Sequence, residues 1–162
     1  LATPLGAGLL YVNKNKTHRI WPLLANGNTD KTDIRRLNHI GTHPVHTDLA
    51  ISNSIDYLNW LGIKRKEKRM RFLQRYWSDR LRNIENVIVN TPEDINRSCG
   101  IGNVGITSMS PSEMARTLMD KYKIFTVAID YANVRGCRIS PNIFTTTDEL
   151  DRFVDAVKKM AT

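Results

Sequence analysis

One arginine of this chain, Arg138, stands in a stretch that otherwise reads as a buried strand, CRIS at residues 137–140. A buried guanidinium is costly without an anionic partner, and the nearest acidic residue on its N-terminal side is Asp130. A guanidinium fixed on a strand can hold a carboxylate through two parallel hydrogen bonds, and every amino acid carries a carboxylate. The alternative is a structural arginine whose head reaches solvent or pairs with a carboxylate of the fold such as Asp151.

A second candidate site lies in the segment LNHIGTHPVHTDLAI, residues 37–51. Gly41 and Thr42 precede a predicted helix, where unpaired backbone N–H groups and the helix dipole favour an anion. A glycine lets the backbone approach a ligand closely, and a threonine hydroxyl adds a hydrogen-bond donor. These features suit a phosphate, but the local signal is weak, because a Gly-Thr pair in a turn ahead of a helix is common.

The same segment contains a set of possible metal ligands, namely His39, His43, His46 and Asp48. Spacings of three and four residues would align the histidines on a helix, but Gly41 and Pro44 interrupt that helix. We therefore expect no metal site. Residue order alone indicates no catalytic triad, and CGIGNVGI, residues 99–106, reads as an alternating core strand rather than a nucleotide-binding turn.

The positive charge of the chain is concentrated in one segment. The net charge is +8, and residues 64–82 hold nine Lys or Arg against Glu67 and Asp79. Apolar residues at helical spacing in this segment predict an amphipathic helix with a basic outer face. That face is either simply solvated or part of a nucleic-acid-binding module, in which Tyr76 and Trp77 would stack on bases.

Length and composition indicate one ordinary globular domain. The chain has 162 residues, of which 41% are hydrophobic and 25% charged, and no apolar run is long enough to span a membrane. Cys99 and Cys137 both lie in apolar, strand-like surroundings. Such sparse cysteines predict buried, inert thiols in a reducing compartment, and hence a cytoplasmic location.

The predicted elements follow the order helix, helix, strand, strand, helix, strand, strand, helix. Their segments are 47–61, 64–82, 87–89, 100–106, a helix capped by Ser110, 125–129, 136–139 and a helix capped by Thr146 with Glu149. A further apolar strand is expected at residues 9–12, and Gly62 is expected to end the first helix. This order predicts an α/β (α+β) fold with a small, mostly antiparallel sheet packed with helices.

Three segments, in this order, resemble the C-terminal part of the class V aminotransferases, the pyridoxal-phosphate (PLP) enzymes that include isopenicillin N epimerase-like proteins and cysteine desulfurases. They are PLGAGLLYV at 4–12, IGTHP at 40–44 and CRISPNIFTTTDELDRFVDAV at 137–157. The resemblance implies a fold-type I PLP-dependent transferase. Residues 1–38 would then be the end of the large cofactor-binding domain with its connection, and residues 39–162 the C-terminal small domain.

The resemblance also implies roles for individual residues. Gly41 and Thr42 would bind the phosphate of pyridoxal 5'-phosphate, in many relatives that of the neighbouring subunit of a homodimer with shared active sites. Arg138 would hold the α-carboxylate of the amino-acid substrate. The family's Schiff-base lysine normally lies just before the segment matched by residues 4–12, and residues 1–13 contain no lysine. We therefore expect this chain to lack an N-terminal portion and to be inactive alone.

The loop before Arg138, residues 130–136, bears on the type of reaction that the resemblance implies. The desulfurase branch uses a cysteine on the loop before this arginine, and residues 130–136 contain none. Sulfur transfer is therefore disfavoured, whereas aminotransfer, epimerisation and lyase chemistry stay open. Two other classes compete with the enzyme: the nucleic-acid-binding module of residues 64–82, and a non-catalytic interaction domain in which both motifs are purely structural.

Overall fold

The computed structural model describes residues 3–23, 30–38, 41–42 and 44–162. The chain divides into two compact units, Leu1–Trp60 and Leu61–Thr162. The predicted domain boundary after residue 38 concerns the complete enzyme and stays a prediction.

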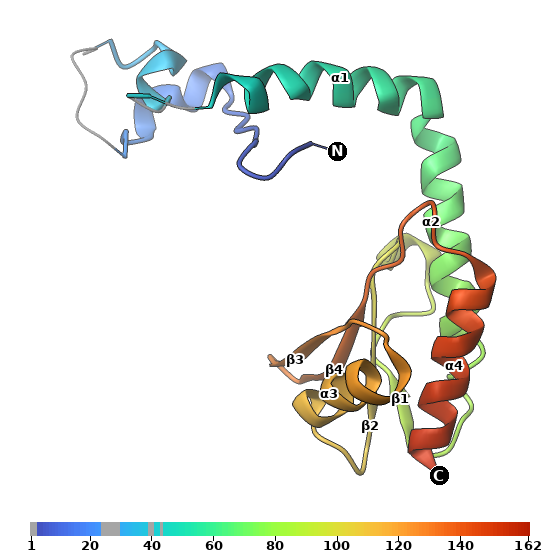
Figure 1. Ribbon diagram of the computed structural model, residues 1–162. Helices are drawn as coiled ribbons and strands as arrows, with labels where there is room; N and C mark the ends of the chain where they lie inside the picture. The colour runs from blue at the N-terminus through green and yellow to red at the C-terminus, as the bar shows by residue number, and fades with distance from the viewer. Residues whose placement is uncertain (1–2, 24–29, 39–40, 43) are drawn as a thin grey trace. The chain divides into compact units, whose positions relative to one another are not determined.

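The strands of the described residues form one antiparallel sheet in the second unit, in the order β1-β2-β4-β3 (Figure 1). They are β1 (Val87–Val89), β2 (Gly102–Ile106), β3 (Val127–Tyr131) and β4 (Val134–Ile139), with the 3-10 helix η3 (Ile95–Arg97) between β1 and β2. This sheet, interleaved with helices, confirms the predicted α+β class. The inner strand β4 pairs on both sides, with β2 and with β3.

The helices begin and end at the signals that the sequence contains. The φ of Gly62, +87°, separates α1 (Val45–Leu61) from α2 (Ile63–Ser78). Ser110 caps α3 (Pro111–Tyr122), and Thr146 with Glu149 forms the predicted capping box of α4 (Thr147–Ala161). None of the helices in the described ranges is long and apolar enough to cross a membrane.

The core of the second unit lies between α2, α3, α4 and one face of the sheet. Trp77 of α2 and Phe153 of α4 are buried and meet edge to face, with ring centroids 5.6 Å apart and planes at 84°. Val104 and Cys137 are the fully buried strand residues against which these helices pack. Gly102 lies directly against the indole, because a Cβ there would approach Trp77 to 2.5 Å. Packing therefore requires a glycine at this position.

The first unit contributes nothing to this core within the described residues. Its 3-10 helices η1 (Lys14–Arg19) and η2 (Ile34–Leu37) are joined by the buried Arg36, which donates to the carbonyl of Thr17 at 2.7 Å. Several of its large apolar side chains are mostly exposed, namely Leu5, Leu9, Leu10, Tyr11, Trp21 and Leu23. The predicted strand at residues 9–12 is wrong, because these residues adopt no strand conformation and the described part of the chain offers them no pairing strand.

A polar network ties α2 to α4 in the second unit. The carboxylate of Asp151 accepts from the Tyr76 hydroxyl at 2.9 Å and from the guanidinium of Arg80, which also lies over the Tyr76 ring. The Arg80 guanidinium, and next the Tyr76 hydroxyl, hold the pKa of Asp151 below its usual 3.8.

This network predicts a specific acid sensitivity. A lowered carboxylate pKa stabilises the fold above its unfolded value, and the contribution is lost as the pH falls through the folded pKa. Asp151→Asn should therefore lower the free energy of unfolding at pH 7 and flatten its fall between about pH 5 and pH 2, measured by urea unfolding. Asp155→Asn, an exposed carboxylate of the same helix with no polar partner in the described structure, is the matched control. Equal pH profiles for the two variants would contradict this role.

Candidate functional site

Arg138 faces away from the core on the inner strand β4. Its chain neighbours Cys137 and Ile139 are buried, and successive strand side chains point to opposite faces, so Arg138 itself is exposed. The prediction that this arginine is buried is therefore wrong, because the strand is covered by helices on one face only. Its guanidinium makes no hydrogen bond or ion pair with the described residues, and the carboxylate of Asp151 pairs with Arg80 instead.

Arg138 lines a shallow depression of about 330 Å³. The rest of its lining comes from the sheet and from the connection between β1 and β2: Asn90, Thr91, Pro92, Arg97, Ser98, Ile101, Gly102, Asn103, Ile129 and Val134. No residue of α1–α4 and no acidic residue is among these described lining residues. Its volume falls at the lower end of the roughly 300–1,000 Å³ usual for ligand sites. The depression is therefore an accessible, positively charged surface that can receive a carboxylate.

Asn103 lines the depression beside Arg138. In the sheet register it lies directly opposite Arg138, and its amide oxygen accepts from Asn90 at 2.7 Å. Its own amide nitrogen is buried and has no hydrogen-bond partner among the described residues. A buried donor without a partner costs about 1–3 kcal/mol, so this nitrogen is a local cost to the fold beside Arg138.

Sequence reasoning missed Asn103 and a second arginine of the lining, Arg97. The positions of both residues depend on features that hydrophobic periodicity does not predict. Asn103 meets Arg138 through the register of β2 on β4, and Arg97 through the path of the connection between β1 and β2. Both are polar residues in or near a predicted strand, and this is the signal that could have identified them. Polar residues in such positions are common, so the signal is weak.

Gly41 and Thr42 lie in the first unit, shortly before α1. Gly41 has a φ of +118°, a conformation that residues with side chains rarely adopt. Thr42 is exposed, and its hydroxyl makes no hydrogen bond within the described part of the chain. A free hydroxyl beside a glycine ahead of a helix fits a phosphate group. Because Arg138 belongs to the other unit, the meeting of these residues in one site stays a prediction.

The possible metal ligands fall only partly within the structure. His39 and His43 lie outside the described residues, as does Ile40 of the IGTHP motif. His46 is exposed in the first turn of α1. No group of three or more His, Cys, Asp or Glu side chains in the described ranges is arranged to hold a metal ion.

Several arginines in and just after the basic helix α2 serve the fold. Arg69, Arg75 and Arg82 donate to the backbone carbonyls of residues 145, 93 and 91 at 2.8, 2.8 and 3.0 Å. These bonds fix the loops around the sheet to the helix. Much of the charge that suggested a nucleic-acid partner is therefore used internally.

The aromatic residues expected to stack on nucleic-acid bases are also not available. Trp77 is fully buried in the core, and Tyr76 is half-buried with its hydroxyl bonded to Asp151. The predicted role of these two residues in a nucleic-acid-binding module is wrong, because the helical period places Trp77 on the inner face of α2.

The two cysteines differ, contrary to the prediction that both are buried. Cys137 is buried, and burial raises the pKa of its thiol, whereas Cys99 is exposed in the connection before β2.

A thiol titration follows directly from this difference. The folded chain should react rapidly with one equivalent of a disulfide reagent, and the second thiol should react only on unfolding. Cys99→Ser should remove the rapid phase and keep the slow one. Two rapid equivalents in the folded protein would show that Cys137 is accessible.

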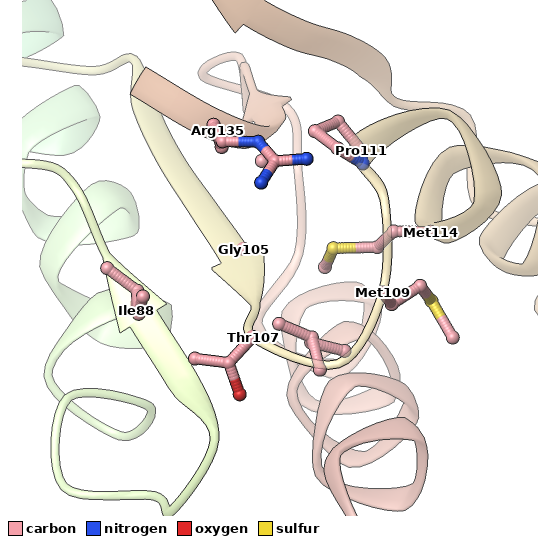
Figure 2. A pocket seen from close by; sticks show the side chains of 9 residues that line it. Ile88, Gly105, Thr107, Met109, Pro111, Met114 and Arg135 are labelled. Carbon is pink, nitrogen blue, oxygen red and sulfur yellow. The ribbon is translucent and has the colours of Figure 1, made fainter. Parts of the chain in front are cut away.

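A second hollow, of about 180 Å³, lies where β2 leads into α3 (Figure 2). Ile88, Met109 and Met114 give it a mainly apolar lining, and Arg135 lies at its edge. Arg135 is paired with Asp130 at 3.4 Å. This hollow therefore lacks an unpaired charged group among its described lining residues, which distinguishes it from the depression around Arg138.

Residues 130–136, predicted to be a loop, form the tips of β3 and β4 instead. The register pairs Tyr131 with Val134, which leaves only Ala132 and Asn133 in the turn. Both have positive φ values, +49° and +68°, as a two-residue hairpin turn requires. Residues 130–136 are thus the end of a tight hairpin, and they contain no cysteine; the cysteine of this hairpin is Cys137, on β4.

Comparison with solved structures places this fold among the fold-type I PLP enzymes. The chain resembles the cysteine desulfurase CsdA from Escherichia coli with a TM-score of 0.78 and 20% identity, over 97% of this chain and 43% of that one. It resembles a cysteine desulfurase from Thermococcus onnurineus NA1 with a TM-score of 0.75 and 15% identity, over 93% and 42%. For an alanine–glyoxylate aminotransferase from Nostoc sp. the values are 0.58 and 15%, over 78% and 34%. The chain spans less than half the length of each of these proteins.

Sequence comparison identifies the family more narrowly. The model of the family described as Aminotransferase class-V matches residues 1–153, so this chain belongs to the class V aminotransferase family. No curated protein matches the chain.

Proposed function

We propose that this chain is the C-terminal, substrate-binding part of a PLP-dependent class V enzyme that acts on an amino acid. The observation that carries the proposal is Arg138, an exposed guanidinium without a partner in the described structure, which lines a depression free of acidic side chains. Membership of a family of PLP enzymes supports the cofactor.

In this proposal Arg138 orients the substrate. Its two parallel N–H groups bind the α-carboxylate, and the pairing of β4 with both neighbouring strands fixes the direction from which they do so. When bound, PLP supplies an electron sink for the charge that develops at the α-carbon. By holding the carboxylate, Arg138 would fix the orientation of the substrate, and with it the orientation of the bond that breaks at the α-carbon.

Gly41 and Thr42 hold the phosphate of PLP in this proposal, the glycine through its backbone and the threonine through its hydroxyl. We propose that they serve the cofactor of the neighbouring subunit in a homodimer. The exposed apolar side chains of the first unit support the proposal that this unit contacts other polypeptide. Exposed Leu9, Leu10 and Trp21 are typical of a protein–protein interface.

The reaction in this proposal is aminotransfer, epimerisation or lyase chemistry, as in the isopenicillin N epimerase-like branch. Residues 130–136 contain no cysteine to accept sulfur, and Cys137 of β4 is buried in the core. The likeness to cysteine desulfurases, at 20% identity or less, is a likeness of fold. We also propose that the lysine that bonds to the cofactor belongs to the large domain of the longer protein. The proposed location of that protein is the cytoplasm.

The test uses the longer protein in which this chain is joined to its upstream polypeptide. That protein is loaded with PLP and titrated with a panel of amino acids while the cofactor absorbance is followed. We expect at least one amino acid to change the absorbance in a saturable way, and chiral chromatography of the products then separates epimerisation from aminotransfer and lyase reactions. Failure to bind PLP, or a spectrum that no amino acid changes, would contradict the proposal.

A further inference from the structure

The depression around Arg138 contains a second guanidinium, that of Arg97. Arg97 ends the 3-10 helix η3 and is exposed, and its side chain makes no hydrogen bond or ion pair within the described part of the chain. Two cations therefore line one shallow surface, and neither is neutralised by the protein.

Hydrogen bonds hold the backbone in place both before and after Arg97 in the sequence. The guanidinium of Arg71, on α2, donates to the carbonyls of Ile95 and Ser98, which flank Arg97. Asp94 caps η3 by accepting from the N–H of Asn96 at 2.9 Å. Arg97 is thus carried by a braced segment, so its side chain starts from a fixed point at the edge of the depression.

The acidic residues that follow lining residues in the sequence are engaged elsewhere. Asp94 is used by the cap of η3, Glu93 lies 3.9 Å from Arg82, and Asp130 lies 3.4 Å from Arg135. A ligand with one carboxylate would neutralise only one of the two guanidinium groups. A ligand with two acidic groups would satisfy both guanidinium groups.

We propose that Arg97 binds a second acidic group of the substrate, so that the enzyme acts on dicarboxylic amino acids or amino acids with an equivalent side-chain anion. This inference rests on the proposed function, in which Arg138 holds the α-carboxylate. Arg97 is then the residue that sets specificity, because it has no role in binding the carboxylate that all amino acids share.

The test compares ligands that differ by one charge at nearly constant shape. Glutarate and its monoamide are titrated into the PLP-loaded longer protein at low ionic strength, where exposed charges are least screened, and dissociation constants are measured by isothermal titration calorimetry. Succinate and adipate then show how the affinity depends on the spacing of the two carboxylates. The variants are Arg97→Gln, Arg138→Gln and, as a matched control, Arg116→Gln, an exposed arginine of α3 outside the depression.

We expect the wild-type protein to bind glutarate at least about tenfold more tightly than the monoamide, the effect of one additional charge-assisted contact. Arg97→Gln should abolish this preference and leave monoamide binding unchanged, and Arg116→Gln should change neither. Equal affinity of the wild-type protein for the two ligands, or a preference that survives Arg97→Gln, would overturn the role of Arg97. Monoamide binding that is unaffected by Arg138→Gln would instead overturn the proposed function, so the two failures are distinct.

Discussion

Replacing Arg138 by alanine is expected to weaken amino-acid binding by the PLP-loaded protein about tenfold to a hundredfold. The expectation follows from the value of a hydrogen bond to a charged group, about 1.5–3 kcal/mol, and from about 1.4 kcal/mol per factor of ten in affinity. Cofactor affinity and the free energy of unfolding should change little, because Arg138 is exposed and has no partner to lose in the described structure. Absorbance titrations with the amino acid and with PLP give the two affinities.

The reciprocal variant, Thr42→Ala, should give the opposite pattern. Its hydroxyl is free in the described structure, so its removal should loosen the cofactor and change amino-acid affinity only slightly once PLP is saturating. Arg116→Ala, an exposed arginine distant in sequence from both sites, should change neither affinity. If Thr42→Ala weakened the amino acid and Arg138→Ala the cofactor, the two roles would have to be exchanged.

The largest expected loss of stability comes from Trp77→Ala, about 3–5 kcal/mol in the free energy of unfolding. The indole is fully buried, packs edge to face on Phe153 and covers Gly102, where no side chain can fill the space it leaves. Urea unfolding followed by far-UV circular dichroism measures the loss without depending on tryptophan fluorescence.

Trp21→Ala is the matched control for Trp77→Ala, since Trp21 is 90% exposed. Its removal should change the free energy of unfolding by less than about 0.5 kcal/mol in the isolated chain. A comparable loss for both variants would mean that Trp77 is not the centre of the core. The same comparison tests the nucleic-acid reading, because a buried Trp77 that the fold requires cannot stack on bases.

The parts of the fold that the sequence predicts well are those with a local signal. Ser110 and Thr146 cap helices at the predicted positions, Gly62 ends a helix, and β1 covers the predicted residues 87–89. In each case the hydrogen bonds or the backbone angle depend on residues a few positions apart, so tertiary packing does not override them.

The wrong predictions concern residues whose conformation or burial depends on segments that are distant in the sequence. Residues 9–12 have the composition of a strand but no pairing strand among the described residues, and Cys99 lies outside β2 because the strand begins at Gly102. Arg138 was misjudged for a related reason: apolar neighbours on both sides suggested a strand buried on both faces. Only the positions of the helices show that one face is open.

The candidate site shows the same division. The types of Gly41, Thr42 and Arg138 suggest anion binding without a structure, but a Gly-Thr pair also occurs in ordinary turns and an arginine can be structural. Their binding roles stay predictions. The residues that line the depression together with Arg138 could not be predicted. Asn103 lies opposite Arg138 through the register of β2 on β4, and Arg97 lies on a loop that hydrogen bonds from Arg71 hold in place. Both contacts need the sheet to be assembled first.

The most direct test of the central claim, that Arg138 grips the substrate carboxylate, compares an amino acid with the amine that lacks only that carboxylate. In the PLP-loaded protein, affinity for the amino acid should exceed affinity for the amine by at least about tenfold, and Arg138→Gln should bring the two to nearly equal values. A preference for the amino acid that is as large in Arg138→Gln as in the wild type would contradict the claim.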